Sequence, residues 1–101
     1  MMKSEAIELV VQYKDGTEIK ENTAKVFASK KSVSRNEFYA AYGVGLRPGY
    51  IFVMHPAEFK LADIEVDGIV YSATHVRHNG TLYEIVRTYQ KDIYNLEITV
   101  K

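Results

Sequence analysis

His75 and His78 are the residues whose types and spacing come closest to a chemical site, because imidazoles three positions apart can share a metal ion on a helix. The surrounding segment reads instead as a strand that runs into the turn dipeptide Asn79-Gly80. Positions i and i+3 of a strand face opposite sides of a sheet, so the two histidines are expected to be exposed polar residues that share no metal ion. The chain has no cysteine and only three histidines to complete a metal site. We therefore predict no metal and no cofactor.

Motifs of catalysis are also absent from the sequence. The 101 residues contain no G-x-S-x-G elbow, no H-E-x-x-H helix, no phosphate-binding glycine loop and no paired-carboxylate motif. We therefore predict a protein that is not an enzyme. A compact enzyme is the alternative, and its mark would be a pocket with a carboxylate or histidine of perturbed pKa.

The chain has no net charge, but its basic residues are not evenly distributed along the sequence. Thirteen basic and thirteen acidic residues give a formal net charge of zero, unlike a protein whose main task is to hold nucleic acid. One block is basic, since no acidic residue interrupts Lys25, Lys30, Lys31 and Arg35. These four are candidate contacts to DNA or to an acidic neighbouring subunit, and the alternative is a solvated rim. No apolar run approaches the roughly 20 residues of a membrane span, so we expect a soluble intracellular protein.

Alternating apolar residues indicate that the basic block belongs to a mainly β fold. Residues 7–13 alternate as a strand, and Asp15-Gly16 predicts a primed turn with positive φ at both residues, followed by a return strand at 18–29. Ile19 stands alone among polar residues, so the tip of this hairpin is expected to project into solvent. Later strands are expected at 50–55, 64–71, up to 76, 82–89 and 94–100, with one helical turn at 57–60. We predict one domain over residues 1–101, a small β-barrel or sandwich of about six short antiparallel strands with one short α-helix.

The short helix is predicted at residues 34–42. Ser34 and Glu37 form a capping box, and Gly43 ends the helix. The loop that follows, 43–49, combines glycines and a proline with apolar side chains, so these side chains are expected to pack against another surface and not to remain in water.

Arg87 is the charged residue with the most apolar surroundings. Strict alternation in 85–89 places it on one strand face with Ile85 and Tyr89. We expect its stem to pack on the sheet and its guanidinium to form a structural ion pair, in preference to a nucleic-acid contact.

Three segments carry a family resemblance: S-R-N-E-F-Y-A-A-Y-G-V-G-L-R-P at 34–48, Y-E-I-V-R-T-Y at 83–89 and N-L-E-I-T-V at 95–100. They resemble the head-closure (stopper, head–tail joining) proteins of long-tailed phages and prophages. The resemblance implies a structural virion assembly protein that forms a ring at the head–tail connector, closes the DNA exit channel after packaging and docks the tail. The implied partners are the portal adaptor (connector) ring, the tail-completion protein, about twelve copies of the chain itself and packaged DNA held without sequence specificity. No membrane and no small-molecule substrate are implied, and the location is the host bacterial cytoplasm during assembly and then the virion.

The resemblance also assigns roles to particular residues. A flexible loop from every subunit closes the channel in this family, which implies a gating loop of Gly43, Val44, Gly45, Leu46, Arg47, Pro48 and Gly49. Structural roles fall to Ser34, Glu37, Arg87 and Tyr89.

The chain departs from the family pattern at residues 63–82, where two turn dipeptides stand in place of one compact hairpin. An added or elongated hairpin is therefore expected there. The alternative function is a small β-barrel that binds single-stranded nucleic acid, or another protein-interaction module. A nucleic-acid binder would show exposed aromatic residues beside bases on one sheet face.

Overall fold

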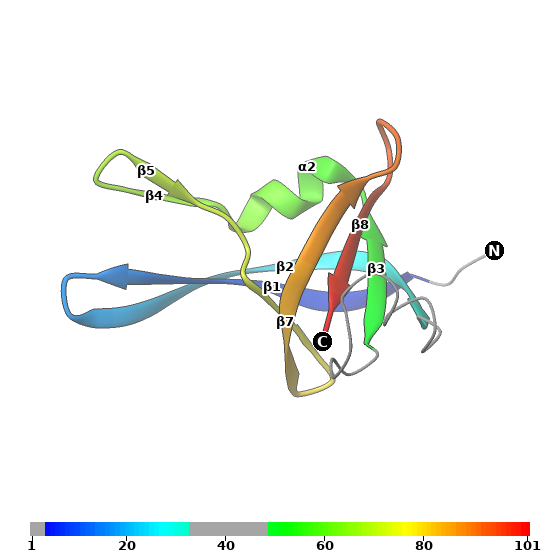
Figure 1. The fold of residues 1–101 in the computed structure, drawn as a ribbon, viewed down its shortest axis with the longest axis horizontal. Helices are drawn as coiled ribbons and strands as arrows, with labels where there is room; N and C mark the ends of the chain where they lie inside the picture. Colours follow the sequence, from blue (N-terminus) through cyan, green and yellow to red (C-terminus); the bar gives the residue numbers. More distant parts are fainter. Residues whose placement is uncertain (1–3, 33–48) are drawn as a thin grey trace.

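The computed structural model describes residues 4–32 and 49–101, and its main feature is a closed barrel of six antiparallel strands (Figure 1). In barrel order these are β1 (Ser4–Asp15), β2 (Glu18–Ser32), β3 (Tyr50–Met54), β8 (Leu96–Val100), β7 (Thr81–Gln90) and β6 (His75–His78), which returns to β1. The predicted fold class, a small mainly β barrel with a short helix, is confirmed.

The remaining elements lie outside the barrel wall. Helix α2 (Pro56–Phe59) continues into the 3-10 turn η1 (Lys60–Ala62), and β4 (Ile64–Val66) pairs with β5 (Ile69–Tyr71) as a separate two-stranded sheet. The added hairpin expected at 63–82 is this β4–β5 hairpin. The helix predicted at 34–42 falls outside the described residues, as does the capping box of Ser34 and Glu37.

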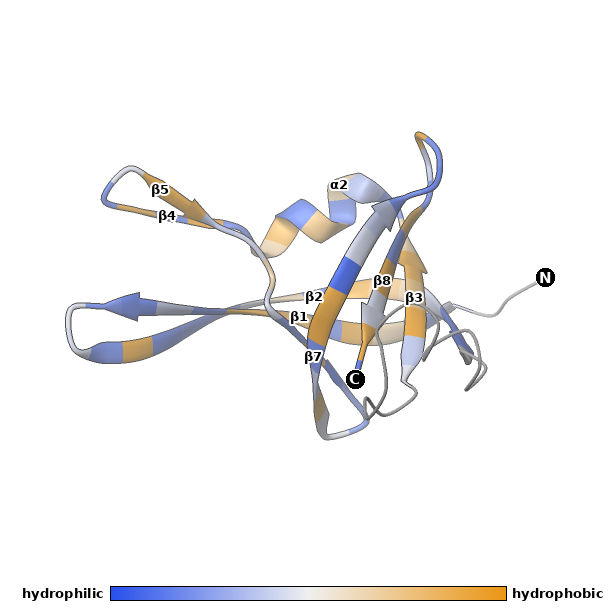
Figure 2. Ribbon diagram, in the orientation of Figure 1, coloured by the Kyte–Doolittle hydropathy of each residue, from blue (hydrophilic) through white to orange (hydrophobic). Residues whose placement is uncertain are grey.

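Inward-facing residues of the alternating strands fill the barrel. Leu9 and Val11 on β1 meet Phe52, Ile98 and Val100 from the opposite wall, and all five are fully buried. Burial of an apolar side chain of this size contributes about 1.5–3 kcal/mol, so these residues account for much of the stability. Figure 2 shows apolar residues along the barrel strands and mainly polar ones towards the tip of the β1–β2 hairpin.

Turn chemistry fixes the hairpin registers. Both residues of Asp67-Gly68 and of Asn79-Gly80 have positive φ, between 50° and 80°, as primed turns require. The first hairpin differs from the prediction: Asp15 pairs with Glu18, so the turn residues are Gly16 and Thr17, and only Gly16 has positive φ. The reason is that glycine stands at the first central position of the two-residue turn, where a turn of the II′ kind needs positive φ at that residue alone.

The β1–β2 hairpin is longer than the barrel that it helps to form. On one side β1 pairs with β6 only over residues 8–10, and on the other β2 pairs with β3 only over residues 29–32. Residues 12–21 therefore extend beyond the wall as a two-stranded projection, called the β1–β2 arm below. Figure 1 shows the arm and the β4–β5 hairpin projecting on the same side of the barrel.

Candidate functional site

The β1–β2 arm and the β4–β5 hairpin are fastened to each other near the barrel. The rings of Tyr13 on the arm and Tyr71 on β5 have centroids 5.8 Å apart and planes inclined by 33°. The side-chain amide of Asn22 donates a hydrogen bond of 2.7 Å to the carbonyl oxygen of Ala62, the last residue of η1. These two contacts fix how the projections lie relative to one another.

The tips of both projections carry exposed apolar side chains. Ile19 on the arm is 77% exposed, and Ile69 and Val70 on the β4–β5 hairpin are 55% and 61% exposed. The arm also bears an open groove of about 270 Å³ lined by Gln12, Tyr13, Lys14 and Ile19, below the roughly 300–1,000 Å³ of ordinary ligand pockets. Such tips suit contact with another protein better than capture of a small molecule.

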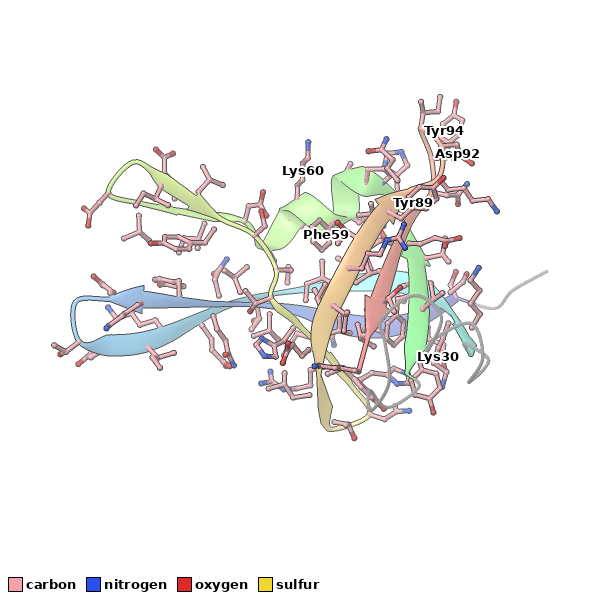
Figure 3. The ribbon with its side chains drawn as sticks, viewed as in Figure 1. Lys30, Phe59, Lys60, Tyr89, Asp92 and Tyr94 are labelled. Atoms are coloured by element: carbon pink, nitrogen blue, oxygen red, sulfur yellow. The ribbon has the colours of Figure 1, made fainter. Side chains whose placement is uncertain are left out.

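The β7–β8 turn is a third exposed apolar feature. Ile93 and Tyr94 are 69% and 65% exposed, and Figure 3 shows Tyr94 and Asp92 at the end of the molecule away from Lys30. The carboxylate of Asp92 accepts from the backbone amides of Tyr94 and Asn95, at 2.8 and 2.9 Å, and from the Asn95 side-chain amide. Donation first by that side chain and then by the Tyr94 amide lowers the pKa of Asp92. The turn therefore presents its apolar residues in a fixed conformation.

The described lysines of the basic block do not form one patch. Lys25 and Lys31 lie on the outer face of β2, whereas Lys30 lies on the other face, with its ammonium 4.6 Å from the ring centroid of Tyr50. Lys31 is paired with Glu97 at 3.3 Å. Arg35 falls outside the described residues. Lys25 is thus the base of this block that extends freely from the described part of the barrel.

Arg87 does not have the surroundings that its sequence predicts. A β-bulge between Ile85 and Arg87 adds one residue to β7, so Ile85 lies opposite buried Val100 while Arg87 is exposed on the outer face. Its guanidinium lies 5.5 Å from the ring centroid of Tyr89, and no described carboxylate pairs with it. The expected shared face with Ile85 is wrong, because the bulge reverses the alternation of faces. The expected ion pair stays a prediction, since only the described carboxylates lack this contact.

Gly49 is the one residue of the expected gating loop inside the described part of the chain. It directly precedes β3, and a Cβ atom added there would collide with the carbonyl oxygen of Val100 on β8. Only glycine allows this approach of two backbones. Residues 43–48 of the loop lie outside the described residues, so their role stays a prediction.

The two histidines lie on opposite faces of β6, as the strand spacing predicts. His75 binds the Thr74 hydroxyl at 2.8 Å, whereas His78 is 5% exposed and packs edge-on against Phe52 at 5.5 Å between ring centroids. The prediction that His78 is exposed is therefore wrong, because this residue faces the barrel interior. Within residues 4–32 and 49–101 no three His, Asp or Glu side chains gather as metal ligands would.

Sequence reasoning identified the exposed arm tip from Ile19 alone, but not the other apolar projections. Ile69 and Val70 read as ordinary strand residues, and Tyr94 as the start of an amphipathic strand. Their exposure depends on β4–β5 standing outside the barrel and on the turn residues preceding β8.

Comparison of the chain with protein-family models, with curated proteins and with solved structures gives no match. Among the described elements, no helix has the length and apolar character needed to cross a membrane.

Proposed function

We propose that this chain is a structural subunit of the head–tail connector of a long-tailed phage or prophage. There it forms a ring, closes the DNA exit channel after packaging and provides the docking surface for the tail. The proposal starts from the resemblance of residues 34–48, 83–89 and 95–100 to head-closure proteins. A small antiparallel barrel is the fold that this resemblance implies. The proposed partners are the adaptor ring, the tail-completion protein, packaged DNA and further copies of the chain.

The observation that carries the proposal is the pair of hairpins that leave the barrel with apolar tips. Ile19, Ile69 and Val70 are each more than half exposed. A two-stranded hairpin is marginally stable by itself, and apolar groups left in water add nothing to the fold. In a ring, each subunit contacts the next through two different surfaces, and a projecting arm reaches the neighbour's surface. An assembly role would give these exposed tips a surface to pack against.

The proposal is tested in a strain that produces the particle. Removal of the gene should leave heads that fill with DNA, lose it again and attach no tails, scored by electron microscopy and by protection of DNA from nuclease. Normal yields of tailed, filled particles contradict the proposal. A gene position between portal and capsid genes on one side and tail genes on the other supports it.

The gating role of residues 43–49 has its own test. Replacement of Val44 and Leu46 with serine should leave the melting temperature nearly unchanged, because the proposed contacts join subunits at the channel. The same variant should let filled heads leak DNA. A double variant that unfolds assigns these side chains to the barrel core, and one that melts normally and retains DNA places the channel closure elsewhere.

A second candidate function is binding of single-stranded nucleic acid, favoured by exposed aromatic residues beside bases on the outer face. Phe27 is 61% exposed and lies two positions from Lys25, and Tyr89 is 51% exposed beneath the Arg87 guanidinium. Stacking of bases on such residues contributes about 1–3 kcal/mol per base. Fluorescence anisotropy with labelled oligothymidine distinguishes the candidates: micromolar affinity that falls with salt and with Tyr89→Ala supports this second function, and no binding removes it.

A further inference from the structure

One edge of β2 has no strand partner among the described residues. Strand β3 pairs with β2 only from Ser29 onwards, so no described strand pairs with the edge at residues 18–28, and the described contact of η1 with this segment is the hydrogen bond from the Asn22 side chain to Ala62. An edge strand without a partner is a template for pairing with another chain. Natural edges are often protected by lysine, so the alternative reading of Lys25 is that it blocks such pairing.

The hydrogen bonds of β1 show which β2 residues point their backbone N–H and C=O groups towards this edge. The carbonyl oxygen of Val10 accepts from the Thr74 amide at 2.8 Å, and the Gln12 amide donates to the Thr74 hydroxyl at 3.0 Å. Even-numbered β1 residues thus direct their backbone groups away from β2. Their β2 partners, among them Thr23 opposite Val10 and Glu21 opposite Gln12, occupy the pairs without mutual hydrogen bonds. Odd-numbered β2 residues therefore direct N–H and C=O towards the open edge.

The side chains of the same residues form a self-complementary series. In order they are apolar, acidic, neutral, basic and apolar, and all five are exposed: Ile19, Glu21, Thr23, Lys25 and Phe27. The carboxylate of Glu21 accepts a hydrogen bond of 3.1 Å from the Gln12 side-chain amide and lies 3.6 Å from Arg77, and Lys25 has no ion pair with any described carboxylate.

We propose that this edge binds a second copy of itself, antiparallel, with the twofold axis at Thr23. This register sets Ile19 opposite Phe27 and Glu21 opposite Lys25 of the partner, and by symmetry repeats both pairs. Its five facing odd-numbered positions would give about ten backbone hydrogen bonds, two for each closely spaced pair. Opposite charges and apolar side chains that face across strands stabilise a sheet.

Other registers lose this complementarity. An axis at Glu21 sets two carboxylates opposite each other, and an axis at Lys25 does the same for two ammonium groups. An axis at Asn22 or Ala24 separates both the charged pair and the apolar pair. Of these registers, only the one with its axis at Thr23 brings together both the opposite charges and the apolar side chains.

The twofold contact goes beyond the proposed connector role and does not depend on it. An isologous contact closes on itself, whereas a ring requires a contact between two different surfaces. The dimer is accordingly a state of the free chain. Loss of ring assembly would leave this dimer untouched, and loss of the dimer would leave the ring to be tested by particle assembly.

The experiment measures the mass of the full chain by sedimentation velocity and light scattering, at concentrations from about 1 to 500 μM. Wild type should shift from one copy of 11.5 kDa to two. E21K and K25E each place like charges opposite each other at two positions and should weaken the dimer at least about tenfold. The double variant E21K/K25E exchanges the charges and should restore the dimer. E18K, with the same charge change on the other face of β2, is the matched control and should dimerise like wild type.

Amide hydrogen exchange provides a second readout on wild type, so the test does not depend on a variant that folds. The amides of Thr23 and Lys25 should become protected as concentration rises, while that of the turn residue Thr17 should not. A chain that stays monomeric across the range overturns the proposal. So does a dimer that E21K and K25E leave intact, or one that the charge exchange fails to restore although every variant melts like wild type.

Discussion

Contact between the Tyr13 and Tyr71 rings should couple the β1–β2 arm energetically to the β4–β5 hairpin. The centroid separation of 5.8 Å and inclination of 33° fall within the range of attractive aromatic pairs. Such pairs contribute about 0.5–1.5 kcal/mol beyond the area that they bury. We therefore expect a coupling free energy in this range from a cycle of Tyr13→Ala, Tyr71→Ala and the double variant.

The single substitutions have predictable costs. Both tyrosines are half-buried and pack against the core, so each loses about half of the roughly 1.5–3 kcal/mol that full burial of a large side chain provides. With the ring contact added, each should lower the free energy of unfolding by about 1–3 kcal/mol. The double variant should cost less than the sum, because the ring contact is lost only once. For a domain of this size, each kcal/mol corresponds to about 4–8 °C in melting temperature.

Urea denaturation of the four proteins measures the coupling directly. A matched control cycle combines Tyr71→Ala with Ile93→Ala, on the β7–β8 turn away from the projections, and should be additive within about 0.5 kcal/mol (Figure 1). Additivity in the tyrosine cycle itself would refute the reasoning, since it would mean that the two hairpins do not support each other. The exposed tips would then have no fixed relation to one another.

Three further predictions concern single positions. Gly49→Ala should destabilise the fold by about 1–3 kcal/mol in thermal melts, because its Cβ would collide with the β8 backbone, and an unchanged melt would mean that the two backbones separate easily. Arg87→Ala should change the free energy of unfolding by less than about 1 kcal/mol, since the exposed guanidinium contacts the Tyr89 ring, and a larger loss would reveal a buried partner. The pKa of Asp92 is lowered by hydrogen bonds from the Asn95 side chain and neighbouring amides, so its contribution to stability is present above the unfolded pKa and is lost as pH falls through the folded pKa. Carbon-detected NMR titration should show the Asp92 pKa rising towards its ordinary value in Asn95→Ala, and an unchanged pKa would remove this hydrogen bond from the account.

Much of the barrel was predictable because its local signals agree. Asp67-Gly68 and Asn79-Gly80 adopt the left-handed conformations that their residue types favour, and each joins two antiparallel strands. The alternation in β1 places Leu9 and Val11 in the core. Here local preference and tertiary burial point to the same structure.

The errors arise where a single residue changes the alternation. Nothing in the residue types of 85–89 indicates a bulge, yet one inserted residue turns Arg87 from the expected packed face to the outer face. His78 ends a strand of four residues, too short for its pattern to distinguish the inner from the outer face, and barrel closure places it over Phe52. The β1–β2 arm and the unpaired edge of β2 could not be predicted from local sequence either, because they depend on how far β1 and β2 extend past their neighbours in the barrel.

Closure of the barrel also decides where this chain is able to associate. Strand segments paired on both sides offer no backbone groups to a partner, so among the described residues pairing between chains falls to segments with a free edge, and residues 18–28 of β2 are one such segment. If the connector ring also uses the β2 edge, the dimer and the ring exclude each other, and dimer formation would hold the free chain back from assembly. The charge variants separate these cases. E21K should prevent the dimer. If the ring pairs through other residues of the β2 edge, E21K should assemble into particles at a lower protein concentration than wild type does. If the ring uses a different surface, the two proteins should assemble at the same concentration.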